Sequence, residues 1–219
     1  MHQTVTNFNN IQNLIKTNQE KTNNKNNIKI IAVSKTFEIS HINPLIEYGH
    51  TDFGENKVQE AVEKWSSIKT KNTNLSLHLV GKLQSNKTKL ALRIFDYIHS
   101  LDSEKLANKI SEEQKKLEKK PKLFIQVNIG NEVQKFGVDK SSLAELYSYC
   151  KTLNLNVAGL MCIPPLNEPS EIFFKEMNEL NEKLNFKELS MGMSSDYLNA
   201  IKNSATYVRI GSNIFGVRD

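Results

Sequence analysis

Short apolar segments alternate with longer amphipathic segments along almost the whole chain, and this alternation most limits the possible folds. Eight segments predict strands, namely 28–34, 51–54, 75–80, 97–100, 122–128, 156–161, 188–190 and 206–210. Segments between them predict helices, namely 41–48, 57–68, 86–93, 103–119, 141–153, 169–184 and 196–202, with a final turn over 213–216. Strict alternation favours parallel strands joined by crossover helices.

Eight such units predict an α/β fold, a single (β/α)8 TIM barrel. We expect one domain over residues 1–219, in which residues 1–27 form an extra helix and a connector. The apolar residues Val5, Phe8, Ile11, Leu14 and Ile15 have the spacing of that helix. An open doubly wound sheet is the alternative, but no G-x-G-x-x-G follows the first predicted strand to support it.

The first predicted strand leads into Lys35, after a run, residues 30–33, that reads as buried on both faces. Burial penalises a charged ammonium, and a neutral amine is a good nucleophile toward an aldehyde. The alternative is an ordinary surface lysine, because lysine is by far the commonest basic residue here and only Arg93, Arg209 and Arg218 are arginine. The buried run before it favours a Schiff-base lysine, but the sequence pattern at this position alone does not exclude an ordinary surface lysine.

The last two predicted strands are followed by residues suited to an anion. Ser194 and Ser195 precede one helix, and Gly211 and Ser212 follow the strand that carries Arg209. Barrels often bind phosphate after strands seven and eight, where backbone N–H groups at helix starts point at the anion. Plain helix capping by serine is the alternative. An amine for an aldehyde together with a phosphate site suggests pyridoxal 5′-phosphate (PLP).

Composition excludes several other classes of protein. The formal net charge is +5, but the lysines are interleaved with acidic residues, which is typical of solvated helix faces and not of a nucleic-acid site. No apolar run approaches the ~20 residues of a membrane span, and the N-terminus lacks a signal-peptide pattern. Cys150 and Cys162 have neither metal-ligand spacing nor a disulfide framework, so we expect a cytoplasmic protein without a metal.

Two further polar residues stand at or within predicted strands. Asn56 follows the second strand, where its amide is a candidate contact for the cofactor. His78 lies between two leucines inside the third strand, and we interpret it as a satisfied histidine of the core rather than a catalytic base.

Motifs over nearly the whole chain together resemble the pyridoxal phosphate homeostasis proteins, the YggS/PROSC family. The matching stretches, in chain order, are residues 32–35, 53–56, 78–87, 126–128, 159–161 with 163–165, 189–194, and 208–211 with 214–216. The set is specific, although no single stretch is. The departure is the loop over 130–135, which reads Gly-Asn-Glu-Val-Gln-Lys where the family often has Ser-Gly-Glu-Glu, so the role of this loop is open.

The resemblance implies a barrel like the N-terminal domain of bacterial alanine racemases. It implies that Lys35 forms the Schiff base, that Arg209 lies near the ring nitrogen of PLP, and that Asn56 lies beside the cofactor. It also implies phosphate contacts from the four residues Ser194, Ser195, Gly211 and Ser212.

The first functional hypothesis is a non-catalytic PLP carrier in the storage, delivery or homeostasis of the cofactor. Racemisation, the alternative, needs an acid/base group on each face of the substrate carbanion. In alanine racemases a tyrosine from a further domain serves one face, and we expect no such domain here because the chain reaches Asp219 soon after the last predicted strand. A Schiff-base aldolase is a third class. We expect PLP-dependent apo-enzymes as partners, and the resemblance suggests a monomer or weak dimer.

Overall fold

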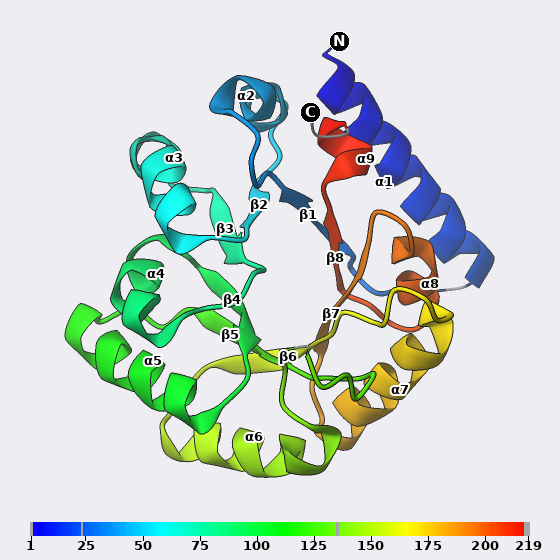
Figure 1. Cartoon of the computed structure of the whole chain (residues 1–219). Coiled ribbons are helices and arrows are strands. Elements are labelled where there is room, and N and C mark those ends of the chain that lie inside the picture. The colour runs from blue at the N-terminus through cyan, green and yellow to red at the C-terminus, as the bar shows by residue number, and fades with distance from the viewer. Residues whose placement is uncertain (1, 23, 135, 217–219) are drawn as a thin grey trace.

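Eight parallel strands close into a barrel in the computed structural model, which describes residues 2–22, 24–134 and 136–216 (Figure 1). The strands pair in chain order, and β1 closes the ring by pairing with β8. Their bounds are β1 Lys29–Val33, β2 Asp52–Glu55, β3 Ser76–Leu79, β4 Tyr97–Leu101, β5 Lys122–Gln126, β6 Val157–Met161, β7 Glu188–Met193 and β8 Tyr207–Ile210. The predicted TIM barrel is confirmed. Lys135 and Arg218 lie outside the described residues.

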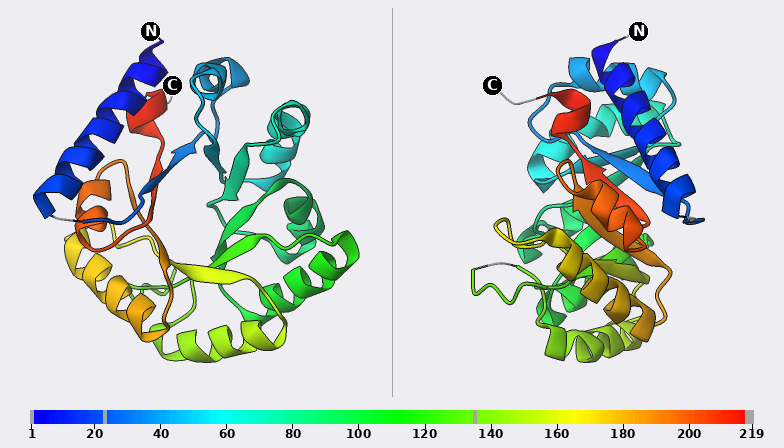
Figure 2. Two further views of the ribbon diagram at one scale, coloured as in Figure 1. Left: turned by 180° about the vertical axis from the view of Figure 1, so that it is seen from behind. Right: turned by 90° about the vertical axis from the view of Figure 1, so that its right-hand side faces the viewer.

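Helices surround the barrel; one precedes β1, and a helix follows each strand. They are α1 Gln3–Thr22, α2 Ile39–Glu47, α3 Val58–Lys71, α4 Thr88–Ile94, α5 Glu104–Leu117, α6 Leu143–Thr152, α7 Ser170–Lys183, α8 Tyr197–Lys202 and α9 Ser212–Phe215, with 3₁₀ turns at Ser85–Lys87 and Lys140–Ser142. Helix α1 adds the predicted N-terminal helix, and Figure 2 shows it alongside α8 and α9. The side-chain amide of Asn7 donates to the carbonyl of Ile214 at 3.0 Å, which joins the two ends of the described chain. Among the described residues, no helix is long and apolar enough to cross a membrane.

The apolar core has two parts because each strand buries both faces. The larger part lies between the strands and the helices and includes Trp65, Phe53 and Phe174. The smaller part lies apart from it and is formed by Ile31, Val33, Tyr97, Phe124, Met161 and Tyr207. These residues belong to β1, β4, β5, β6 and β8, and the polar side chains of His78 and His99 stack on two of their rings. The inner core is therefore mixed, with polar groups that must find partners in the protein.

The seventh strand is longer than the sequence predicts. The expected strand ends at residue 190, whereas β7 continues to Met193. Gly192 adopts φ +89°, and the register with β8 shifts between Ser190 and Met193. The sequence predicts a loop here because the segment is rich in serine and glycine. In the structure the segment is the irregular end of the strand. The other strand bounds differ from the prediction by one or two residues, a usual uncertainty at element ends.

Candidate functional site

A cavity of about 550 Å³ opens where the carboxyl ends of β1, β2, β3, β6, β7 and β8 meet. All seven residues that the sequence singles out for a cofactor line it, and these are Lys35, Asn56, Ser194, Ser195, Arg209, Gly211 and Ser212. Val33, Val80, Ile163 and Met193 supply an apolar wall. The site thus has the usual place for a TIM barrel, and the structure brings together residues up to 179 positions apart in the sequence.

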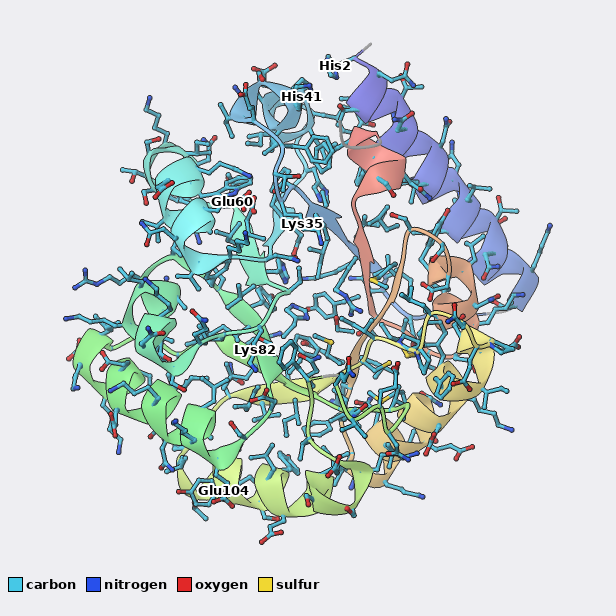
Figure 3. All side chains as sticks on the ribbon, viewed as in Figure 1. His2, Lys35, His41, Glu60, Lys82 and Glu104 are labelled. Atoms are coloured by element: carbon cyan, nitrogen blue, oxygen red, sulfur yellow. The ribbon has the colours of Figure 1, made fainter. Side chains whose placement is uncertain are left out.

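Lys35 lies in a turn just beyond β1, two residues after the strand ends at Val33, so it is not itself the last strand residue (Figure 3). Its side chain is half-buried and lines the cavity. The residue before it, Ser34, is fully buried and donates its hydroxyl to a carboxylate oxygen of Glu55 at 2.8 Å. The lysine therefore follows a fixed piece of backbone while its own side chain faces the cavity.

Asn56 is held in place by a close backbone approach from the next strand. A Cβ atom on Gly81 would come within 2.3 Å of the carbonyl oxygen of Asn56. Only glycine is compatible with this packing, because a contact that short to a backbone atom cannot be relieved by a rotamer change. The turn after β3 thus supports the turn after β2 at the edge of the cavity.

Arg209 lies on β8, as predicted, and is almost completely buried. One guanidinium nitrogen donates to both the carbonyl and the hydroxyl of Ser190 at 2.8 Å, and the other donates to the carbonyl of Cys162 at 2.8 Å. All of these acceptors are neutral. Burial lowers the pKa of Arg209 from its ordinary value, but arginine keeps its proton in proteins. The guanidinium charge is therefore oriented without being neutralised by these acceptors.

A line of buried hydrogen bonds runs from Arg209 through the barrel interior. The hydroxyl of Ser190 lies 2.9 Å from Nδ1 of His99, and Nε2 of His99 lies 3.0 Å from Nδ1 of His78. Nε2 of His78 in turn lies 3.1 Å from a carboxylate oxygen of Asp52 at the start of β2. His78 is thus a satisfied core histidine, as predicted, and it belongs to a chain that reaches the cavity.

The protonation of this chain has one consistent solution. Burial lowers the pKa of His78 and lowers that of His99 further, so both rings are neutral. Burial alone would raise the pKa of Asp52, but the hydrogen bonds from His78 and Thr51 and the charge of Lys29 together outweigh it, and the carboxylate stays ionised. An ionised carboxylate only accepts, so His78 carries its proton on Nε2, His99 does the same, and Ser190 donates to His99. Every bond then points from Arg209 toward Asp52.

The turns after β7 and β8 are tied to each other. The backbone N–H of Gly211 donates to the hydroxyl of Ser194 at 3.3 Å, and the side-chain amide of Asn213 donates to the carbonyl of Ser194 at 2.9 Å. The N–H of Met193 donates to a carboxylate oxygen of Asp196 at 2.6 Å. These contacts hold together the two turns whose residues Ser194, Ser195, Gly211 and Ser212 line the cavity. Hydroxyl groups and backbone N–H groups are the kinds of donor that bind anions.

The chemistry available is that of an amine, a guanidinium and neutral donors. No group of three or more His, Cys, Asp or Glu side chains suited to a metal occurs within the described ranges. Both cysteines are buried free thiols, and burial raises the pKa of Cys162 to about 12, so this thiol is not a nucleophile at neutral pH.

Four residues near the site escape the sequence reasoning. Asp52 and His99 complete the hydrogen-bonded chain, and Glu60 and Lys64 on α3 lie behind Lys35. A signal existed for His99, since His78 and His99 occur inside two consecutive apolar strands, but none existed for Asp52. Glu60 and Lys64 carry no such signal, because charged residues are expected on any exposed helix.

The comparisons with known proteins agree with this geometry. Residues 7–219 match the family model described as alanine racemase, N-terminal domain. A pyridoxal phosphate homeostasis protein of Haemophilus influenzae is 39% identical over 97% of this chain and 95% of that protein. This chain belongs to the pyridoxal phosphate homeostasis protein family. The family expected from the sequence motifs is thereby confirmed.

Two kinds of solved structure are similar to this protein. PipY of Synechococcus elongatus, solved with PLP bound, is 34% identical, with a TM-score of 0.79 over 92% of this chain and all of that one. An alanine racemase of Clostridium difficile is 16% identical, with a TM-score of 0.69 over 93% of this chain but 56% of that one. The second likeness shows the shared barrel alone, and much of the racemase lies outside it.

Proposed function

We propose that this protein binds PLP at the carboxyl ends of its strands, with the cofactor held as a Schiff base on Lys35, and acts in PLP homeostasis, storage or delivery without catalytic turnover. The observation that carries the proposal is the convergence of an amine, a guanidinium and a set of hydroxyl and backbone donors on one cavity of about 550 Å³. PipY, a relative of full-length similarity, has been solved with PLP bound.

The residues of the cavity fit the groups of PLP. When bound, PLP supplies an aldehyde, and the amine of Lys35 forms a C=N bond with that carbon while the aldehyde oxygen leaves as water. Ser194, Ser195, Gly211 and Ser212 supply the neutral donors for the phosphate, and Val33, Val80 and Ile163 supply apolar surface for the ring. Asn56 lines the same cavity, and its amide is the group that we assign to the side of the cofactor.

Arg209 has the role of facing the ring nitrogen. Its contacts with Ser190 and Cys162 fix the guanidinium plane, and its five N–H donors exceed the three hydrogen bonds that these partners receive. A permanently protonated guanidinium can donate to the ring nitrogen but cannot accept from it. The nitrogen therefore stays unprotonated, which makes PLP a weaker electron sink than a carboxylate partner would.

The groups that line the cavity favour a PLP carrier over a racemase. Racemisation needs a proton donor or acceptor on each face of the substrate. Among the described residues that line the cavity, Lys35 is the one side chain suited to proton transfer, since the rest are apolar, hydroxyl, amide, glycine or arginine.

We accordingly propose residues 1–219 as one PLP-binding unit, cytoplasmic and monomeric or weakly dimeric, with PLP-dependent apo-enzymes as recipients. An amino-acid racemase is the competing function.

The experiment is a titration of purified protein with PLP, followed by absorbance, for the wild type, Lys35→Ala and the control Lys82→Ala. Lys82 lies in the turn after β3, with its ammonium 3.5 Å from the ring centre of Phe136. We expect the Schiff-base chromophore in the wild type and in Lys82→Ala but not in Lys35→Ala. The same preparations should show negligible interconversion of L- and D-alanine. Enzyme-like turnover that depends on Lys35 would establish the racemase instead.

A further inference from the structure

A second lysine lies directly behind Lys35. Lys64 belongs to α3, and its side chain is 12% exposed. Its ammonium donates at 3.0 Å to the carbonyl of Ser34, to a carboxylate oxygen of Glu55 and to a carboxylate oxygen of Glu60. An ammonium has three N–H donors, so these partners use all of them. Lys64 is therefore committed to holding other groups of the protein.

The carboxylates of Glu55 and Glu60 also bind the residues on either side of Lys35. The same oxygen of Glu55 that binds Lys64 accepts from the hydroxyl of Ser34 at 2.8 Å, and Glu55 is fully buried. The oxygen of Glu60 that binds Lys64 accepts from the backbone N–H of Thr36 at 2.7 Å. Figure 3 shows Glu60 on α3 on the side of the barrel where Lys35 lies. The residues before and after the lysine are thus bonded to one ion cluster.

The backbone at Thr36 requires such support. Thr36 has φ +67°, in the left-handed region that β-branched residues rarely adopt. A conformation of this kind persists only where the surroundings impose it, and such residues gather at functional sites. The hydrogen bond from Thr36 to Glu60 fixes the turn at this residue. The turn in question is the one that sets the direction of Lys35.

We propose that Lys64, together with Glu55 and Glu60, is a positioning group for Lys35. The cluster holds the backbone from Ser34 to Thr36 so that the Lys35 amine meets an incoming aldehyde in a reactive orientation. Lys64 acts through the backbone and touches neither aldehyde nor phosphate. This inference rests on the proposed function in that the aldehyde is the one carried by PLP.

The test uses full-length protein prepared without cofactor and three variants, Lys64→Met, Glu60→Ala and the control Lys71→Met. Lys71 is an exposed lysine at the end of the same helix. Three quantities are measured, namely hydrogen exchange of the Thr36 amide, the rate constant of chromophore formation with PLP, and the free energy of unfolding. If Lys64→Met fails to fold because the buried Glu55 loses its ion-pair partner, the three quantities can still be measured in Glu60→Ala, since Glu60 is only partly buried.

We expect Glu60→Ala to lower the protection of the Thr36 amide and to slow chromophore formation by about 10-fold, since small displacements of a reacting group reduce rates strongly. Lys71→Met should match the wild type in all three measurements. Wild-type exchange at Thr36 and a wild-type rate in Glu60→Ala would overturn the proposal. A wild-type protein that forms no adduct would refute the proposed function instead, while the exchange measurement would still decide whether the cluster holds the turn.

Discussion

The two sides of the cavity hold their basic groups by different means. On the β1 side, Lys35 is flanked by residues bonded to an ion cluster of Glu55, Glu60 and Lys64. On the β8 side, Arg209 is held by carbonyl and hydroxyl oxygens that carry no net charge. Ion pairing on the first side orients backbone, whereas neutral acceptors on the second side orient a charge without cancelling it. The difference fits the proposed function, in which the Lys35 amine reacts with an aldehyde and the Arg209 guanidinium remains a cation.

Charge reversal on the neutral side should have the largest effect. In Arg209→Glu, a buried carboxylate would face the carbonyl oxygens of Ser190 and Cys162 with no donor between them. We expect the free energy of unfolding to fall by about 3–5 kcal/mol, measured by urea denaturation, because a buried charge is left unpaired. The chromophore of any folded protein with PLP should also change.

The control for this prediction is Arg93→Glu, which reverses the charge of an exposed arginine at the end of α4. Surface substitutions of this kind change stability by about 0.5 kcal/mol or less. Equal effects of the two variants would contradict the account, because net charge rather than the buried hydrogen bonds would then determine stability.

The buried histidines and Glu60, which belongs to the ion cluster beside Lys35, should affect stability in different pH ranges. Burial lowers the pKa values of His50, His78 and His99 below 6.5 in the folded protein. As pH falls below 6.5 the unfolded chain binds protons that the folded protein does not, so stability falls by up to about 1.4 kcal/mol per pH unit for each histidine, until the folded pKa is reached. Burial alone would raise the pKa of Glu60, but the Thr36 and Lys64 hydrogen bonds lower it, so the stability that Glu60 contributes is lost only as pH falls below about 4.5.

Urea denaturation between pH 7.5 and 5.0 measures this difference. His99→Phe should reduce the slope below pH 6.5, while Glu60→Ala should leave the slope there unchanged. His99 stacks on Phe124 with ring centres 4.4 Å apart, so phenylalanine preserves much of the packing. A slope that is insensitive to His99→Phe would show that the interior histidines do not carry the acid sensitivity.

The smallest effect concerns the strained turn itself. Thr36→Gly removes the side chain that disfavours φ +67°, and the relief exceeds the entropy that glycine adds to the unfolded chain. We expect the free energy of unfolding to rise by about 0.5 kcal/mol in urea denaturation, with no gain in Thr36→Ala, which keeps a Cβ atom. A loss of stability in Thr36→Gly would indicate that the turn is not strained.

The fold and the lining of the site could be predicted because they depend on local patterns. Alternating strands and helices determine the barrel, and the barrel brings strand ends such as Lys35 and Arg209 to one mouth. The supports of these residues could not be predicted in the same way. Lys64 approaches Ser34 across 30 positions in the sequence, and His99 approaches Ser190 across 91, so both contacts depend on tertiary packing that no local pattern reports.

Attachment of PLP to Lys35 is tested most directly by borohydride reduction. The purified protein is incubated with PLP, reduced, digested and mapped by peptide mass spectrometry, with Lys64 and Lys82 as the neighbouring lysines for comparison. We predict one major adduct, on the peptide that contains Lys35, and none on the peptide that contains Lys64, whose ammonium is fully hydrogen-bonded. An adduct mainly on another lysine, or a protein that takes up no PLP, would contradict this prediction.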